Sequence, residues 1–406
     1  MNKTLRLFWA VELEFLSPIH IGKGSSDAYM GAAEVVQNGA SEYVIPGTSL
    51  AGLFFSKMML SAKLDQEDAL LKRLLPDDQN AEASPIVFRT VVLKPKGDYL
   101  RDRVRIDRET KTADDKAKFS QWEVLPENTT VLIELDNVSK GSRRLSEDKV
   151  SILKGWINQV FASWHKEGFF IGAHSSVGNG FTKVAKVKMS TLNKDNYQVY
   201  LNTASTDTQI VEKMQGTELD LASFDFIPSF KRRYRLIIKT GLHDPLLIKG
   251  NVFYPSKKNP ETDAAFINRD GRPYIPGSSI RGAISSFMEK YDVPGWKELT
   301  GDTDRAGRIM FTDLSMIDSE AKAEFIQIER HAEDQLSRAI YGSGKFDEER
   351  VFNAVFQGEI LLASGNSLEQ ESLEHIFGFL KDGLRHRLIG LGSGAAHPEM
   401  TLEEVK

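Results

Sequence analysis

The sequence feature that most constrains the fold is a motif that occurs twice. Tyr-Val-Ile-Pro-Gly-Thr-Ser-Leu-Ala-Gly ends at Gly52, and Tyr-Ile-Pro-Gly-Ser-Ser-Ile-Arg-Gly ends at Gly282, with the two Pro-Gly pairs 230 residues apart. The segments 17–24 and 244–251 also correspond, since each has a prolyl turn, an apolar stretch and a Lys or Gly near its end, at an offset of 227. The chain of 406 residues therefore contains two copies of one unit, with loops of different length.

Hydrophobic periodicity predicts the same order of elements in both copies. Alternating apolar residues predict a strand before each motif, and apolar residues three and four apart predict a helix after it, with the Thr and Ser residues as N-caps. The order β-α-β-β-α-β predicts an α+β fold of two tandem ferredoxin-like (RRM-like) domains with inserted thumb hairpins and loops. The further predicted strands are 86–93, 130–135, 308–314 and 357–362, and the further helices are 146–164 and 368–380.

The boundary between the two domains is predicted near residue 226. Residues 189–225 are rich in Asn, Asp, Thr and Ser and form a linker, which we assign to a first domain of residues 1–225. The second domain is then 226–406. Each copy closes on a Gly-rich segment, at 172–180 and 390–394, but only the first has a following strand pattern, at Phe181 to Val184.

Composition excludes several classes of function. The chain has no cysteine, which excludes disulfides, thiolate zinc sites, iron-sulfur clusters and cysteine nucleophiles. The sequence contains no run of about 18 apolar residues, which a membrane span would require. We expect a cytoplasmic protein. The formal charge is −5, so nucleic-acid binding would require local basic patches.

The helix that follows each Pro-Gly pair is a candidate phosphate site. A helix N-terminus offers free N–H groups and the positive end of the helix dipole, and Arg281 adds a bidentate donor. The first copy has Ala51 in that place, with Lys57 as a partial substitute. Ordinary helix capping is the alternative. The candidate contacts are Gly47, Thr48, Ser49, Lys57, Gly277, Ser278, Ser279 and Arg281.

A basic segment in the first copy is a candidate RNA-binding hairpin. Residues 89–118 contain ten Lys or Arg against six Asp or Glu, with Tyr99, Phe119 and Trp122 in or beside them. One basic face would suit phosphate contact and the separation of bases, whereas a solvated, salt-bridged hairpin is the alternative. The corresponding segment 328–339 is less basic. The candidate contacts in both copies are Arg101, Arg103, Arg105, Arg108, Arg330 and Arg338.

Two further positions complete the set of candidate RNA contacts. Lys249 lies in the repeated prolyl segment, and His174 lies in the first Gly-rich segment, where backbone amides could line a groove. The eight histidines, which include His20 and His397, show no HxH or HExxH spacing. We therefore interpret most of them as structural or surface residues.

The motifs together resemble the RAMP superfamily, the backbone subunits of type III CRISPR effector complexes. The resemblance rests on Ile275 to Ala283, on the terminal Gly-rich loop and on Ile106-Asp107-Arg108-Glu109-Thr110. It spans nearly all of the chain and occurs twice, as in the tandem fusions of type III-D complexes. It implies guide RNA, target single-stranded RNA and other effector subunits as partners, and a thumb hairpin that interrupts the guide–target duplex.

The resemblance also implies one catalytic residue. Cleaving members have an Asp in the loop before the Ile-Pro-Gly motif, and Asp263 matches it. In the first copy, two ways of aligning the loop place Gly31 or Ala33 there, so that copy is expected to be degenerate. A shifted loop would bring Asp27 or Glu34 near instead.

The implied reaction is attack of a ribose 2′-hydroxyl on the adjacent phosphate of a flipped-out nucleotide. Asp263 would accept the hydroxyl proton or ligate Mg²⁺ (or Mn²⁺). The first alternative is a non-catalytic RNA-coating scaffold, and the second is a metal-independent endoribonuclease that processes guide RNA with His20 or another His as base.

Overall fold

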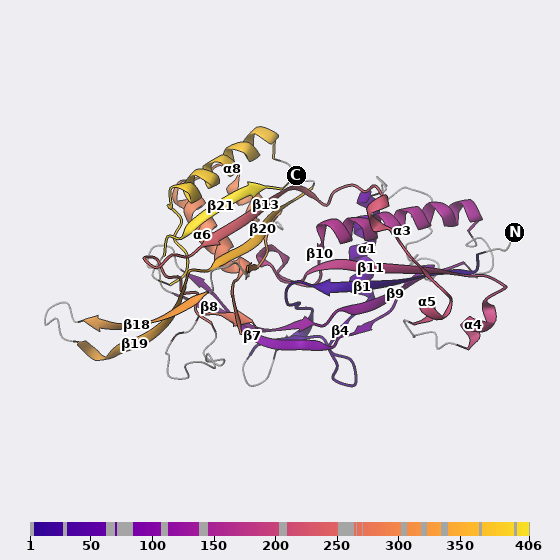
Figure 1. The fold of residues 1–406 in the computed structure, drawn as a ribbon, viewed down its shortest axis with the longest axis horizontal. Helices are drawn as coiled ribbons and strands as arrows, with labels where there is room; N and C mark the ends of the chain where they lie inside the picture. Colours follow the sequence, from indigo (N-terminus) through magenta and orange to yellow (C-terminus); the bar gives the residue numbers. More distant parts are fainter. Residues whose placement is uncertain are drawn as a thin grey trace. The chain divides into compact units, whose positions relative to one another are not determined.

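The computed structural model describes two compact units (Figure 1). The first unit comprises residues 1–99, 122–173 and 180–229, and the second comprises 100–121, 174–179 and 230–406. The predicted domain boundary near 226 stays a prediction, because the units follow spatial contacts and each draws on separate stretches of chain. The described residues are 4–26, 31–61, 70, 84–106, 113–137, 145–202, 209–250, 264, 266–269, 271–301, 307–317, 323–333, 340–364, 368–393 and 396–405.

An antiparallel sheet with two helices on one face forms the first unit (Figure 1). The strand order β10-β11-β1-β9-β5 contains the ferredoxin-like order of fourth, first, third and second strand. On the opposite face, the short helix α5 contributes to a smaller apolar cluster with Phe8 and Leu132. The elements are β1 (Arg6–Phe15), α1 (Gly47–Ser61), β5 (Ile86–Phe88), β9 (Thr129–Asp136), α3 (Glu147–Glu167), β10 (Phe169–Phe170), β11 (Phe181–Leu192), α4 (Tyr197–Leu201) and α5 (Ile210–Lys213).

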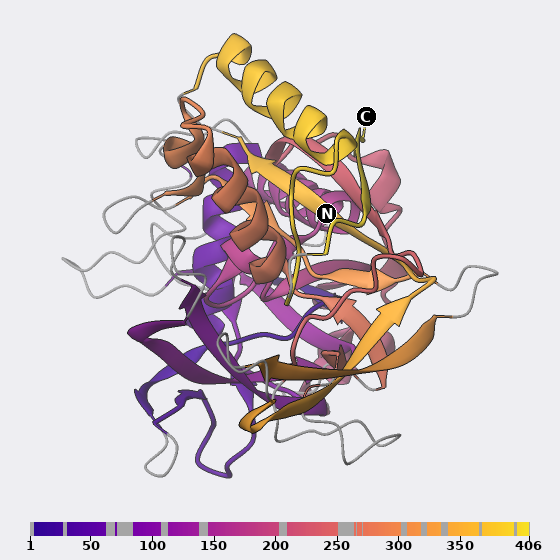
Figure 2. The ribbon, with the colours of Figure 1, turned by 90° about the vertical axis from the view of Figure 1, so that its left-hand side faces the viewer.

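The second unit repeats this arrangement. Its sheet has the order β14-β15-β17-β20-β13-β21, and β16 also pairs with β20. The helices α6 and α8 lie side by side (Figure 2). Between them the rings of Phe287 and Phe379 stack with centroids 5.2 Å apart. The elements are β13 (Phe230–Lys239), β14 (Asn268–Arg269), β15 (Arg272–Ile275), α6 (Gly277–Lys290), α7 (Trp296–Thr300), β16 (Ile309–Phe311), β17 (Leu314–Met316), β20 (Val355–Ala363), α8 (Gln370–Arg385) and β21 (Glu399–Glu404).

Both repeats carry a long hairpin at the predicted place. In the first repeat β7 (Pro95–Ile106) pairs with β8 (Ala113–Pro126), in a sheet that β2 and β3 extend. In the second, β18 (Glu324–Glu333) pairs with β19 (Ile340–Phe352). The remaining elements are β2 (Gly22–Ser26), β3 (Ala33–Val35), β4 (Val44–Ile45), β6 (Val91–Val92), η1 (Ser175–Val177), β12 (Thr217–Glu218) and η2 (Leu221–Ser223).

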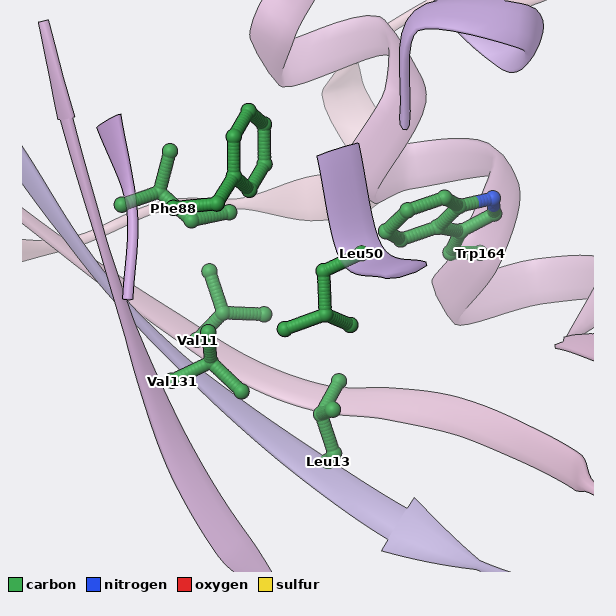
Figure 3. Close-up of a pocket in the computed structure, with 7 residues that line it drawn as sticks. Val11, Leu13, Leu50, Phe88, Val131 and Trp164 are labelled. Atoms are coloured by element: carbon green, nitrogen blue, oxygen red, sulfur yellow. The ribbon is translucent and has the colours of Figure 1, made fainter. Parts of the chain in front are cut away.

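Each unit has its own apolar core between helices and sheet. In the first, the rings of Trp164 and Phe169 stack at 4.0 Å, and Leu50 of α1 faces Val11 and Val131 (Figure 3). The gap that these side chains line measures about 10 Å³, which is room for a water molecule and not for a ligand. In the second core, Tyr234 stacks on Phe377 at 4.3 Å. The predicted α+β fold of two ferredoxin-like repeats is confirmed.

Two local predictions are wrong. The second repeat does have a closing strand, β21, which pairs with β13 and buries Met400. The Thr and Ser residues after Pro-Gly are not N-caps, because both helices already begin at the glycine and the N-cap of α6 is Pro276. Within the described part of the chain, no helix is long and apolar enough to cross a membrane.

Candidate nucleic-acid interface

The first N–H of helix α6 is occupied by a carboxylate. The N–H of Gly277 donates to Oδ1 of Asp313 at 2.9 Å, and Arg269 holds the other oxygen of Asp313 at 2.7 Å. Burial is the largest single effect and lowers the pKa of Arg269, but the charge of Asp313, the hydrogen bond to it and the nearby Tyr274 together raise the pKa above its ordinary value. Asp313 therefore takes the place that we predicted for a phosphate at Gly277.

In the first unit, the acceptor of the first helix N–H is a neutral group. The N–H of Gly47 faces Oγ1 of Thr90 at 3.4 Å, which is a long hydrogen bond to a hydroxyl. Thr48 is exposed and Ser49 is half-buried in the first turn of α1. The helix opening of the first unit thus keeps more of its positive potential than that of the second.

The Gly-rich loop of the first repeat lies against α6 within the second unit. Arg281 donates from Nη1 to Oγ of Ser176 at 2.7 Å and from Nη2 to the carbonyl of Thr300 at 2.8 Å. Burial lowers the pKa of Arg281. Both acceptors are neutral oxygens, so they hold the guanidinium in place without cancelling its charge.

Strand β7 of the β7–β8 hairpin contacts the same loop and α6. Arg103 donates to Oδ1 of Asn179 at 2.9 Å, and Arg101 donates to Oγ of Ser278 at 3.2 Å. The exposed rings of His174 and Phe119 stack with centroids 6.1 Å apart. His174 has a φ of 63°, which turns the backbone into the left-handed region at the start of the loop.

These contacts bring five of the predicted RNA contacts together, and we call them the loop cluster. Each guanidinium makes a hydrogen bond to a neutral oxygen, and an exposed pair of rings lies beside them. Cations and exposed rings are the parts that bind the phosphates and bases of single-stranded RNA. The members are Arg101, Arg103, His174, Ser278 and Arg281, and the partners that the sequence did not indicate are Ser176, Asn179 and Thr300.

A second group of cations lies on the β18–β19 hairpin. Lys249, Arg330 and Arg350 all contact the carboxylate of Glu348, at 3.6, 3.2 and 2.6 Å. The predicted contacts Lys249 and Arg330 thus meet at one anchor. Glu348 and Arg350 were not predicted as part of this group. Two charged residues at i and i+2 in a strand that borders the core could have indicated a buried ion pair.

Lys57 has a structural role in place of the predicted RNA contact. Its side chain is 6% exposed, and Nζ donates to the carbonyl of Ile227 and to Oγ of Ser229, both at 2.7 Å. The carboxylate of Glu167 lies 3.9 Å away. Burial lowers the pKa of Lys57 to about 8, against the opposing effect of Glu167. An ammonium in this position cannot reach an RNA backbone.

The proposed catalytic residue Asp263 lies outside the described residues, but its neighbour is placed. Ala264 accepts from the N–H of Glu349 at 2.8 Å and donates to the carbonyl of Asp347 at 3.0 Å. Ala264 is therefore fixed to strand β19 beside Glu348.

Hydrogen bonds identify the first-repeat counterpart of Asp263. The N–H of Ile267 donates to the carbonyl of Ile248, and that of Val36 donates to the carbonyl of Ile21, both at 2.8 Å. Four residues before Ile267 is Asp263, and four before Val36 is Ala32, which is buried. In this register Ala32 corresponds to Asp263, between Gly31 and Ala33 of the two sequence alignments, and again no acid stands there.

The nearby acids of the first repeat give no substitute among the described residues. The carboxylate of Glu34 pairs with Lys23 at 2.9 Å and accepts from Ser25 at 3.0 Å. Asp27, Arg108 and Arg338 lie outside the described residues, and Arg105 lies in β7 with an undescribed side chain. Ser279 is half-buried in the first turn of α6.

The described side chains do not fit a metal ion. Among them, no group of three or more His, Asp or Glu is arranged to hold one. Glu348, the buried carboxylate beside Ala264, is already bound by cations. A Mg²⁺ or Mn²⁺ ion would depend on Asp263, on RNA oxygens and on water.

His20 is held as a structural residue. It is buried, and its Nδ1 lies 2.7 Å from the carbonyl of Trp122. That contact fixes the orientation of the ring. The position does not favour a base that must approach a ribose.

Comparison with known proteins identifies the family. The RAMP superfamily matches residues 12–183 and 235–396, which is most of the chain and includes both repeats. The chain therefore belongs to the RAMP superfamily. The two matches cover most of the two ferredoxin-like repeats, and the whole segment between β11 and β13 lies outside them.

Among solved structures, a chain in the cryo-EM structure of the Type III-B Cmr-beta bound to cognate target RNA is similar to this one. The two are 19% identical with a TM-score of 0.32, over 43% of this chain and 59% of that chain. The match thus spans less than two thirds of that chain. No curated protein matches this sequence.

Proposed function

We propose that this chain is a guide-RNA-binding backbone subunit of a type III CRISPR effector complex, a tandem fusion of the type III-D kind. Membership of the RAMP superfamily and the RNA-bound Type III-B neighbour support the class of complex. The loop cluster is the observation that carries the RNA-binding part. Other effector subunits are then the protein partners, and a cytoplasmic location belongs to the same proposal.

The loop cluster explains how RNA would be bound. Arg281 is oriented by hydrogen bonds to neutral oxygens, so its charge can attract a phosphate. Arg103, which donates to Oδ1 of Asn179, lies in the same cluster. His174 and Phe119 present exposed rings on which a base can stack, at about 1–3 kcal/mol per base. Backbone contact with stacking needs no particular sequence, which suits a protein that takes different guides.

Cleavage of the paired target RNA is the second part of the proposal. The 2′-hydroxyl oxygen of one nucleotide attacks the adjacent phosphorus, and the bond to the 5′-oxygen of the next nucleotide breaks. The products are a 2′,3′-cyclic phosphate and a 5′-hydroxyl. Asp263 would accept the proton of the attacking hydroxyl or hold a metal ion, and the leaving oxygen takes up a proton.

Replacement of Asp263 tests this part directly. We expect Asp263→Asn to abolish one target-RNA product while the affinity for guide and target stays within about twofold of wild type, because the change removes one carboxylate and leaves the loop cluster intact. Denaturing gels of a labelled target report cleavage, and filter binding reports affinity. An unchanged set of products, or loss of binding, would contradict the assignment.

A non-catalytic RNA-coating scaffold is the second candidate. In that case another subunit cuts, and Asp263→Asn changes nothing. A guide-processing nuclease based on His20 is disfavoured by the buried contact of that ring. Cutting that survives EDTA and is lost in His20→Ala would reinstate it.

A further inference from the structure

Glu348 is a buried carboxylate that cations from three segments share. It is 2% exposed, and Arg350 reaches its Oε2 with Nη2 at 2.6 Å and Nε at 3.1 Å. Arg330 approaches Oε2 at 3.2 Å, and Lys249 approaches Oε1 at 3.6 Å. These residues lie on β19, on β18 and after β13, so the carboxylate joins three parts of the second unit.

Two of the three cations around Glu348 reach the surface. Arg350 is buried and pairs with Glu348 at 2.6 Å. The side chains of Lys249 and Arg330 are 51% and 45% exposed, so both are accessible from solvent while they contact the carboxylate. The guanidinium of Arg350 offsets the cost of burying the carboxylate. The same carboxylate can thus hold two further cations toward solvent.

Strand alternation separates these cations from several acids of the hairpin. Glu348 pairs with Ile328, and Phe346 pairs with Arg330. Paired residues point to the same face, so Arg330, Glu348 and Arg350 share one face of the hairpin. The opposite face carries Glu329, Asp347 and Glu349. The two arginines therefore lie on a different face from Glu329, Asp347 and Glu349, whereas Glu324 shares their face.

The first repeat lacks this arrangement. The bridges between Ile19 and Val124 and between Leu246 and Val351 align the two hairpins at an offset of 227. In that register, Gln121 stands for Glu348, Glu123 for Arg350 and Gly22 for Lys249. Gln121 and Glu123 are buried as well, so the two hairpins have buried side chains at the same positions but differ in their charges.

We propose that Glu348 is a positioning residue that holds Lys249 and Arg330 as a clamp for a phosphate of the RNA backbone. A phosphate needs two or more converging cations at its oxygens, and the shared carboxylate fixes the spacing of these two. The clamp borders β19, the strand to which Ala264 is hydrogen-bonded. The clamp therefore rests on the proposed function, in which the segment around Ala264 meets target RNA.

The clamp is tested by two double variants of the full chain, with a labelled single-stranded RNA as probe. Lys249→Gln with Arg330→Gln removes both cations, whereas Lys239→Gln with Arg235→Gln is a matched control. Lys239 and Arg235 are 55% and 45% exposed, belong to the same unit and also pair with acids. The slope of log Kd against log salt concentration is measured for each.

Loss of two phosphate contacts lowers the salt slope by about 1.4, since each contact with a single strand contributes about 0.7. The control variant keeps the wild-type slope. An unchanged slope in the Lys249 and Arg330 variant, or an equal fall in both variants, would overturn the clamp.

Glu348→Gln tests positioning, because electrostatics alone predicts the opposite sign. Removal of a negative charge strengthens the general attraction to RNA, whereas loss of the anchor frees Lys249 and Arg330 and weakens binding severalfold. Stronger binding by Glu348→Gln would therefore overturn the positioning role. Since this variant leaves Arg350 buried without its partner and can fail to fold, the double variant carries the test in that case.

The clamp and the cleavage proposal fail separately. Asp263→Asn is expected to stop cleavage and leave the salt slope at its wild-type value. If the slope of the Lys249 and Arg330 variant is unchanged while Asp263→Asn stops cleavage, the clamp alone is wrong. If the slope falls by about 1.4 while Asp263→Asn cleaves normally, the clamp stands and the catalytic assignment is wrong.

Discussion

Lys57 ties the end of the first unit to its helices. Its ammonium is bonded to the carbonyl of Ile227 and the hydroxyl of Ser229, and Oε2 of Glu167 also accepts from the N–H of Ser229 at 2.9 Å. The ring of Phe226 lies 5.9 Å from the same ammonium. One buried ion pair thus fixes the last residues of the first unit against α1 and α3.

The pKa of Lys57 gives a pH dependence with a defined sign. Its folded pKa of about 8 lies below the ordinary 10.5, so the unfolded chain binds more protons between these values. The free energy of unfolding of wild type should therefore rise from pH 8 to 10.5 relative to Lys57→Met, by at most about 3 kcal/mol. Chemical denaturation of both proteins across this range measures the difference. If the free energies of unfolding of wild type and Lys57→Met change in parallel with pH, the ammonium of Lys57 is solvated.

At the scale of the element, both motif helices begin where a strand touches a glycine. A Cβ on Gly277 would lie 2.1 Å from the carbonyl oxygen of Phe311, and one on Gly47 would lie 2.2 Å from that of Phe88. Five residues later, Gly282 and Gly52 have nothing within 4 Å of an added Cβ. The first glycine of each motif is required by close backbone approach, and the second is not.

This difference predicts opposite effects for two alanine substitutions in α6. Gly277→Ala forces the strand and the helix apart and should destabilise the second unit by about 1–3 kcal/mol. Gly282→Ala lies on an exposed helical position and should stabilise it by about 0.5–1 kcal/mol. Thermal and chemical unfolding of both variants measure the changes. Equal effects of the two substitutions would show that the contact with Phe311 can relax.

The closing strand β21 shows why one element escaped prediction. Its sequence, Glu-Met-Thr-Leu-Glu-Glu, has only two apolar residues, of which Met400 is buried and Leu402 is partly buried. Such a short pattern does not stand out from a polar terminus. Pairing with β13 decides the structure here, because each of its residues meets a partner in an established strand.

At the scale of the whole molecule, two copies of one skeleton carry different chemistry. The strand orders agree, and the first repeat has Gln121, Glu123 and Ala32 where the second repeat has Glu348, Arg350 and Asp263. The net charge of −5 is therefore compatible with local binding surfaces, since Arg330 and Arg350 of the β18–β19 hairpin lie on a different face from Glu329, Asp347 and Glu349.

Periodicity predicted most of this skeleton, whereas the sites depended on long-range contacts. Strands and helices follow from spacing within one segment, as for β1 and α3. The partners of Arg281, Ser176 and Thr300, are 105 and 19 residues away, and Lys249 and Glu348 are 99 residues apart in sequence. A sequence pattern shows that a residue is charged, but it does not show which distant oxygen will hold that charge.

The most direct test of the central claim is the RNA that copurifies with the chain when it is expressed together with a CRISPR array. We predict a short RNA of uniform length, because backbone subunits coat a guide of defined size through oriented cations and stacked rings. Sizing of the extracted RNA on a denaturing gel, with native mass spectrometry of the complex, gives the result. A bare protein monomer, or RNA of random length, would contradict the assignment.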